Sequence, residues 1–341
     1  MAAWDELDRR FGNAEEGEIR LPVARALFNK GVTLHEQKDY AGAVAAYDEL
    51  VRRFGDAEES EIRLPVAQAL SNKGRDLHEQ KDYAGAVAAY DELVCRFGEA
   101  EGSEIRLLVA EALFNKGVDL GKQKDYSAAA TAYDELLQHF GEAEESDIEL
   151  LVARGLAKKA DALCEQGENA EAVVVWQKAE EAIAVHPHDC SLRNALVCVA
   201  YKHRLRRLLP QAEMLAKTAV SLEPANANLR HTLACVLYLS GKETEALEEA
   251  KRYLDEGETV EETVEDAIEL FVGLAAAGYG KETLRILQDS PSAELLEPLV
   301  VGLRLYLGED VKVAAEIMEV ARDVVKRIEE RREELKSARR A

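Results

Sequence analysis

Apolar residues between Leu70 and Val94 recur at steps of three, four and seven positions, with charged and small polar residues between them. This spacing places the apolar side chains on one face of a helix. The pattern breaks at Lys81 and Asp82, so it predicts two amphipathic helices joined by a tight turn. No stretch shows the alternation of apolar and polar residues that is typical of strands. The sequence therefore predicts an all-α fold.

The two-helix pattern is repeated along the first half of the chain. Aromatic residues fall 43 positions apart in two series, Trp4, Tyr47, Tyr90, Tyr133, Trp176 and Phe11, Phe54, Phe97, Phe140. A fixed period of this length indicates helix pairs that stack on one another rather than one closed domain.

Small residues mark the places where two helices of one unit must approach. Gly74 and Ala86 lie twelve positions apart, and the same gap separates Gly31 from Ala43 and Gly117 from Ala129. We expect a larger side chain at these positions to overpack the contact and to cost about 1–3 kcal/mol.

The unit resembles the tetratricopeptide repeat, with a small residue at its eighth position, an aromatic near the seventeenth, Ala at the twentieth and an aromatic at the twenty-fourth. The aromatic residues near the seventeenth position are Tyr40, Tyr83 and Tyr126. The family's unit has 34 residues, so nine extra residues must lie between units. Two departures are Leu50, Leu93 and Leu136 where the family favours Ala, and Gly55, Gly98 and Gly141 where it has Pro. Long variants such as the repeats of kinesin light chain look similar.

The resemblance implies a right-handed superhelix of antiparallel helix pairs, an α-solenoid that binds other proteins. We predict the second helix of an incomplete repeat at 1–16, four repeats of 43 residues at 17–185, two repeats of 34 residues at 186–257, and degenerate helical pairs at 258–341. The last helix is expected from Glu309 to about Lys336, with a charged, solvated surface. Gly17, Ser60, Ser103 and Ser146 are of the types that cap helix starts. Pro22 and Pro65 suggest a later start or a kink in two of these helices.

The isolated second helix at 1–16 has two interpretations. It is either a cap or the end of a repeat whose first helix lies further upstream, and we favour a fragment of a longer protein because Leu7 and Phe11 keep the apolar pattern. This suggests an alternative function, the sensor or regulatory arm of a larger bacterial-type signalling protein whose ATPase, protease or other effector lies outside this chain.

Charge and cysteine content narrow the classes of partner. The chain has 43 basic and 66 acidic residues and a net charge of −23, which disfavours nucleic acid and anionic membranes and favours basic or neutral proteins. Five cysteines without CxxC spacing argue against a disulfide framework or a zinc module and are expected to be buried thiols. No secretory leader or long apolar run is present, so a cytoplasmic protein is expected. The sequence does not indicate an oligomeric state.

Catalytic and cofactor motifs are missing from the sequence. Residues 278–282 lack the spacing of a phosphate-binding loop and are expected to form a turn between helices. The potential metal ligands at 186–190 are too close together around a proline, and Asp189 is better explained as a helix cap. We therefore predict no enzyme, no cofactor and no metal site. Acidic pairs between units, such as Glu15-Glu16, Glu58-Glu59 and Glu144-Glu145, are expected to be solvated charges, with an acidic ridge as the alternative.

The best functional signal is an asparagine two positions before the small residue in three successive first helices. These residues are Asn29, Asn72 and Asn115, and the fourth unit has Lys158 instead. Asn is a poor helix former, whereas its amide offers the donor and acceptor that a peptide backbone requires. The resemblance implies that first helices line a concave groove and that an Asn here holds an extended peptide. Bonding between neighbouring repeats, or simple duplication of the unit, would also explain the series.

Other residues of the same helices should line this groove. Phe28 and Phe114 would provide apolar contacts, while Arg25, Arg75, His35 and His78 would add polar ones. Arg75 and His78 would suit a carboxylate, although both histidines could equally be spacers. The sequence thus predicts a non-enzymatic scaffold that binds a peptide or helix of a partner protein.

Overall fold

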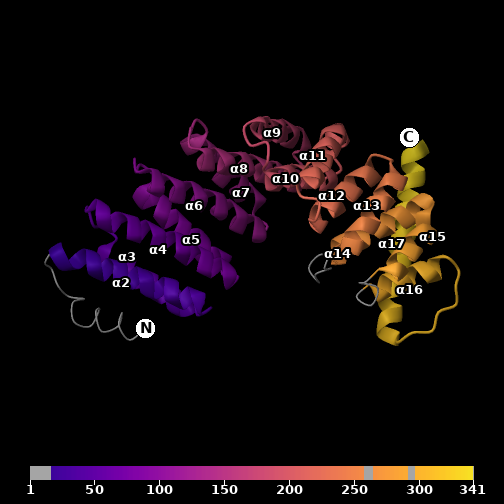
Figure 1. Ribbon diagram of the computed structural model, residues 1–341, viewed down its shortest axis with the longest axis horizontal. Coiled ribbons are helices and arrows are strands. Elements are labelled where there is room, and N and C mark those ends of the chain that lie inside the picture. Colours follow the sequence, from indigo (N-terminus) through magenta and orange to yellow (C-terminus); the bar gives the residue numbers. More distant parts are fainter. Residues whose placement is uncertain (1–16, 257–263, 291–295, 341) are drawn as a thin grey trace. The chain divides into compact units, whose positions relative to one another are not determined.

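The computed structural model describes residues 17–256, 264–290 and 296–340, and within these ranges it contains helices and no strand. The all-α prediction is confirmed. The chain divides into two compact units, Met1–Ala182 and Ile183–Ala341, which we call unit 1 and unit 2 (Figure 1). The predicted isolated helix at 1–16, with Trp4, Phe11, Glu15 and Glu16, lies outside the described residues.

Unit 1 is a stack of helix pairs, an α-solenoid. Its first helices are α2 (Gly17–Glu36), α4 (Ser60–Glu79), α6 (Ser103–Lys122) and α8 (Ser146–Glu165), and its second helices are α3 (Tyr40–Phe54), α5 (Tyr83–Phe97), α7 (Tyr126–Phe140) and α9 (Asn169–Glu181). Each helix contacts the next along the chain, and successive first helices also contact one another (Figure 1).

Unit 2 also consists of stacked helices, but their lengths vary. It contains α10 (Cys190–Lys202), α11 (Leu209–Leu222), α12 (Ala227–Leu239), α13 (Glu243–Glu256), α14 (Val264–Leu274), α15 (Gly280–Asp289), α16 (Glu297–Tyr306) and α17 (Ala315–Arg340). α17 packs along α16 and also contacts α14. It begins six residues after the predicted Glu309, beyond a glycine, Gly308, whose φ of 86° ends the preceding helix segment.

The turns between the two helices of a repeat in unit 1 share one design. Asp39, Asp82 and Asp125 each accept a hydrogen bond from the backbone N–H three residues later, at 3.0 Å. The lysine before each aspartate, Lys38, Lys81 or Lys124, has a left-handed φ of 60° to 62°. A side chain is disfavoured in this conformation by about 1 kcal/mol, so the compact turn is obtained at the expense of backbone strain.

The predicted caps of the first helices are wrong by one residue. Ser60, Ser103 and Ser146 are already helical, and the preceding Glu59, Gly102 and Glu145 occupy the cap position with no side-chain hydrogen bond. Pro65 does not shift the start either, because α4 with proline and α6 without it both run for 20 residues. The proline removes a single bond in the second turn and leaves the helix continuous.

The close approach of two helices at Gly74 involves Tyr90 more directly than Ala86. A Cβ on Gly74 would lie 2.3 Å from a ring carbon of Tyr90, and Gly31 and Gly117 meet Tyr47 and Tyr133 in the same way. The three tyrosine side chains are almost fully buried. The glycine is therefore needed because an aromatic ring of the second helix lies flat against the first.

Several smaller predictions concern helix ends of unit 2 and the cysteines of both units. Asp189 caps α10 as predicted, since its Oδ1 accepts a hydrogen bond from the Leu192 amide at 2.5 Å. Gly278 has a φ of 113° and interrupts the chain between α14 and α15, which confirms a turn here, although α15 begins at Gly280 and the turn is shorter than the predicted 278–282. Cys164, Cys190 and Cys235 are buried as free thiols, while Cys95 is exposed. None of the helices in the described ranges is long and apolar enough to cross a membrane.

Candidate functional site

The first helices of unit 1 form a common surface, which we call the first-helix face: the exposed sides of α2, α4, α6 and α8. Contacts between α2 and α4, α4 and α6, and α6 and α8 hold these helices in register. Because the repeat is constant, equivalent side chains follow one another across the face at every 43rd residue. All the predicted groove residues lie on these helices.

The three asparagines differ in their surroundings. Asn29 is exposed, and Asn72 and Asn115 are half-buried. The Asn72 amide donates a long hydrogen bond, 3.5 Å, to the hydroxyl of Tyr47 in the preceding repeat. No side-chain hydrogen bond links Asn29 or Asn115 to any residue of the described ranges. Bonding between repeats therefore accounts for one asparagine of the series, and only weakly.

The two phenylalanines are part of the packing of their own repeats. Phe28 lies with its ring centroid 6.2 Å from that of Tyr47, and Phe114 lies 6.1 Å from Tyr133. Both are half-buried, so one side of each ring remains on the surface. Ser71 takes the equivalent place in the second repeat and is buried.

Arg25 and Arg75 are two exposed cations of this face. Neither guanidinium forms a hydrogen bond or an ion pair within the described ranges. Arg75 lies close to Tyr47, Tyr90 and Asp76: burial raises the pKa of all three groups, and the Arg75 charge offsets part of each rise. It also borders a cavity of about 210 Å³ lined by Val32, His35, Tyr47, Asn72, Arg75 and Asp76.

His35 and His78 each contact an aspartate of the next repeat, a structural role that we did not predict for them. The Nδ1 atom of His35 lies 2.5 Å from Oδ1 of Asp76 on the next first helix. His78 makes the same contact with Asp119. The reason was not visible from one helix alone, since each partner is 41 residues away.

The aspartates of these pairs are fully buried. Burial raises the pKa of the Asp76 and Asp119 carboxyls, and the hydrogen bonds from His35 and His78 offset part of this rise. The second oxygen, Oδ2, of each carboxyl is buried without a hydrogen-bond partner. Burial, followed by the nearby Asp76 carboxylate, also raises the pKa of Tyr47 to about 12.

The histidine–aspartate pair is absent from the next interface between repeats, where both of its residues are replaced. Gly121 and Ala162 stand where a third pair would have its histidine and aspartate. An aspartate buried without its histidine would be an uncompensated charge, so the two positions can change only together.

Comparison with known proteins identifies the repeat. Residues 9–59 and 71–140 match the family model described as a tetratricopeptide repeat. The matched segments are tetratricopeptide repeats. A tetratricopeptide repeat protein from Parabacteroides merdae ATCC 43184 has the same fold, with a TM-score of 0.53 and 15% sequence identity over 81% of this chain and 97% of that chain. No curated protein matches the sequence.

A second structure with tetratricopeptide repeats is described as the TPR2AB-domain:pHSP90-complex of yeast Sti1. It is 13% identical over 74% of this chain and 99% of that chain, with a TM-score of 0.29. A likeness at this score supports no conclusion about the present protein.

The tetratricopeptide repeats are joined by two further series of contacts that we did not predict. Lysines of the first helices pair with aspartates of the preceding second helices, 25 residues earlier: Lys73 with Asp48 at 2.5 Å, Lys116 with Asp91 at 2.8 Å, and Lys159 with Asp134 at 2.6 Å. Arginines lie over the phenylalanine that ends the second helix of their own repeat: Arg20 over Phe54, Arg63 over Phe97, and Arg106 over Phe140. The repeat period combined with these fixed offsets is the signal that could have revealed them.

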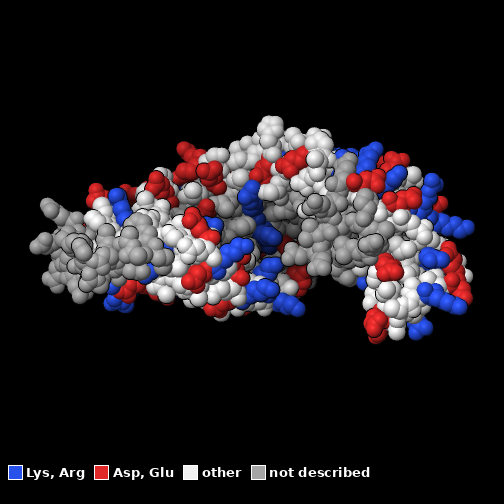
Figure 2. Space-filling view, turned by 60° about the horizontal axis from the view of Figure 1, so that its bottom comes forward, with Lys and Arg blue, Asp and Glu red and all other residues white. Residues whose placement is uncertain are grey.

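The acidic residues between repeats are partly used in the structure. Glu59 pairs with Arg20 at 2.5 Å and Glu145 pairs with Arg106 at 3.0 Å. These glutamates therefore extend the arginine–phenylalanine contacts instead of forming a free acidic ridge. On the face shown in Figure 2, acidic and basic side chains are interspersed over the helices.

Proposed function

We propose that the tetratricopeptide repeats of unit 1 form a non-enzymatic scaffold that binds an extended peptide or a helix of a partner protein along the first-helix face. Tetratricopeptide repeats generally mediate interactions between proteins. The net charge of −23 favours a basic or neutral partner. The 43-residue unit, typical of kinesin-light-chain-like repeats, would space the partner's contacts at one per repeat.

One observation carries this proposal. Most of the copied polar side chains have a structural use: the lysines pair with aspartates, the arginines cover phenylalanines and the histidines pair with buried carboxyls. The side chains of Asn29, Asn115, Arg25 and Arg75 form no hydrogen bond or ion pair within the described ranges. They lie on one face, beside the half-exposed rings of Phe28 and Phe114. Donors, acceptors and apolar surface in this arrangement suit a peptide.

The proposal is tested with a partner recovered by the full chain and identified by mass spectrometry. The double substitution Asn29→Ala with Asn115→Ala should weaken its binding by about 1–3 kcal/mol, because each amide loses a hydrogen bond to the partner. Asn72→Ala is less informative because this side chain also contacts Tyr47. Thermal unfolding of the double variant should be unchanged.

The matched control is Asn169→Ala at the start of α9, which is exposed and lies on a second helix. It should leave the affinity as it was. An Asn29/Asn115 variant that binds the partner as well as the original chain does would show that the first-helix face is not the binding surface.

A further inference from the structure

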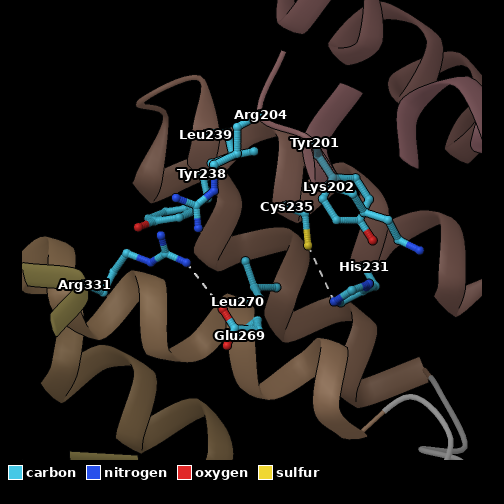
Figure 3. A pocket seen from close by; sticks show the side chains of 10 residues that line it. All are labelled: Tyr201, Lys202, Arg204, His231, Cys235, Tyr238, Leu239, Glu269, Leu270 and Arg331. Atoms are coloured by element: carbon cyan, nitrogen blue, oxygen red, sulfur yellow. Dashed lines mark hydrogen bonds and ion pairs between the residues drawn. The ribbon is translucent and has the colours of Figure 1, made fainter. Parts of the chain in front are cut away.

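Unit 2 has a cavity at the positions that correspond to the first-helix face of unit 1. The small residues Ala200, Ala234 and Gly273 of α10, α12 and α14 take the place of Gly74 in α4. One position after the small residue, Tyr201 and Cys235 correspond to Arg75. Four positions after it, Arg204 and Tyr238 correspond to His78. Three positions before it, His231 and Leu270 correspond to Ser71. These residues line a cavity of about 210 Å³ (Figure 3).

The wall of this cavity is mostly apolar or aromatic. Leu270 is 3% exposed, and the Cys235 thiol and the His231 ring are each 8% exposed. His231 Nε2 and Cys235 Sγ lie 3.5 Å apart, one turn from each other on α12. Figure 3 shows Tyr238 and Leu239 on another side of the same space. A flat apolar group would therefore find extensive contact here.

Two arginines from different elements converge on the rim. Arg204 follows α10 and Arg331 comes from α17, and both extend toward Tyr238 (Figure 3). Their charges lower the pKa of Tyr238 against the larger effect of burial, which raises it. Arg331 is 18% exposed, so its charge is only partly screened by water.

The carboxylates nearby do not fully compensate these cations. Glu269 accepts hydrogen bonds from both Arg327 and Arg331. Glu334 lies 2.7 Å from Arg331 but 3.7 Å from Arg204, which is beyond hydrogen-bonding distance. A second cavity of about 340 Å³ shares Arg204, Tyr238, Leu239 and Arg331 with the first and adds Arg206, Glu243 and Glu334. Together with Lys202, the two cavities have four cationic side chains and three carboxylates.

A cavity with more cationic side chains than carboxylates is unusual in a chain with a net charge of −23. We propose that this cavity of unit 2 binds a ligand that carries a carboxylate or phosphate group on a flat apolar body. The anionic group lies between Arg204 and Arg331, and the apolar part lies against Tyr238, Leu270 and Cys235. The planar guanidinium groups suit both kinds of anion, because each can donate two parallel hydrogen bonds.

The test uses the full chain and three probes of similar size in isothermal titration calorimetry. Benzoate supplies a carboxylate on a ring, phenyl phosphate supplies a phosphate on a ring, and benzyl alcohol supplies the ring without charge. We expect saturable binding of at least one anion and none of benzyl alcohol at the same concentration. The stronger of the two anions identifies the source of the negative charge. If neither anion binds, or if benzyl alcohol binds as well as both, the proposal is wrong.

The variant Arg204→Gly distinguishes an effect on ligand binding from an effect on folding. Arg204 has a left-handed φ of 52°, which glycine adopts without strain, so the variant should unfold at the same temperature as the original chain or higher. Loss of a charge-assisted hydrogen bond should lower the affinity about tenfold or more. Arg331→Gln, on the other side of the site, should have the same effect.

The matched control is Lys124→Gly in unit 1. Lys124 occupies the same turn position with a φ of 62° and also carries one positive charge, but it lines neither cavity. The affinity of the Lys124→Gly variant for the anion should equal that of the original chain. If Arg204→Gly and Arg331→Gln leave binding unchanged, or if Lys124→Gly weakens it equally, the anion does not bind at this cavity.

Discussion

Units 1 and 2 stack helix pairs in two different ways. In unit 1 the same contacts recur at successive interfaces, with lysine–aspartate pairs at three of them and histidine–aspartate pairs at two. In unit 2 the polar contacts are individual. Arg230 pairs with Glu249 at 3.2 Å and with the Pro224 carbonyl at 2.8 Å, and Glu213 accepts from both Lys217 and Lys242.

The difference shows how a repeated sequence separates structural from functional residues. In unit 1 each copied polar residue can be compared with its equivalents, and Asn29 and Asn115 stand out because their side chains form no hydrogen bond within the described ranges. In unit 2 the equivalent positions of α10, α12 and α14 carry different residues, and the cavity and its charges indicate the candidate site. α17 adds to this contrast, because Arg331 and Glu334 contribute to the cavity of unit 2 from outside the repeated pairs.

The largest expected effect concerns the glycine–tyrosine contact of unit 1. Gly74→Ala should lower the free energy of unfolding by about 3 kcal/mol, because the new methyl group would overlap a tyrosine ring that has no room to move. Gly121→Ala is the control, since nothing lies within 4 Å of its Cβ position, and it should stabilise α6 by about 0.5–1 kcal/mol. Urea unfolding followed by circular dichroism measures both. Equal effects at the two glycines would contradict the close contact.

A smaller effect should separate individual from copied ion pairs. Arg230→Met should cost about 2 kcal/mol, because Arg230 is only 9% exposed and its removal leaves the Pro224 carbonyl without its donor and Glu249 with Arg252 alone. Lys73→Met should cost only about 0.5 kcal/mol, because Asp48 is half-exposed and water replaces the lost partner. Chemical unfolding of the two variants gives the comparison, and a larger loss for Lys73→Met would overturn it.

A gain of stability is expected at the strained turns. Lys81→Gly should raise the free energy of unfolding by about 1 kcal/mol, because glycine adopts a φ of 62° without steric cost. Gly167 and Gly241 already occupy this kind of turn with φ values of 84° and 74°. The substitution Gly167→Lys should therefore show the opposite sign. Thermal unfolding measures both, and a loss of stability in Lys81→Gly would mean that the lysine side chain has a structural role.

The smallest effect is the pH dependence of a buried carboxyl. The pKa of Asp76 is raised above its ordinary value of 3.8 by burial, so the folded chain binds the proton more tightly than the unfolded chain. The stability that Asp76 contributes is then present below pH 3.8 and is lost as the pH rises through the folded pKa. The difference in unfolding free energy between the original chain and Asp76→Asn should therefore fall as the pH rises from below 3.8 through the folded pKa. A rising difference would contradict the direction of the shift.

The apolar pattern was sufficient to predict helices, the repeat and the tetratricopeptide repeat family. It failed at the caps of the first helices, because Ser60 and its equivalents suit both the cap and the first helical turn. It did not reveal the contacts of His35 and His78, because their partners, Asp76 and Asp119, lie one repeat away. The spacing of residues within one helix does not indicate that contact, although the repeat period does.

The candidate binding residues of unit 1 were selected by the same spacing, and Asn29, Asn72 and Asn115 lie on the first helices as expected. The cavity of unit 2 was not predicted. Arg204, Tyr238, Glu269 and Arg331 come from four separate segments, and no periodic pattern connects a turn with α17. Such a site depends on tertiary packing.

The constant offsets of 25, 39 and 41 residues between contacting side chains have a consequence for the length of the array. Removing residues 60–102 would bring Lys116 opposite Asp48 and His35 opposite Asp119, and would leave Arg20 beside Glu59 with no new surface exposed. A deletion whose length is not a multiple of the repeat would separate all three series at the junction. The N-terminal array can therefore be shortened or lengthened only in whole copies, and its reach along a partner would change in the same steps.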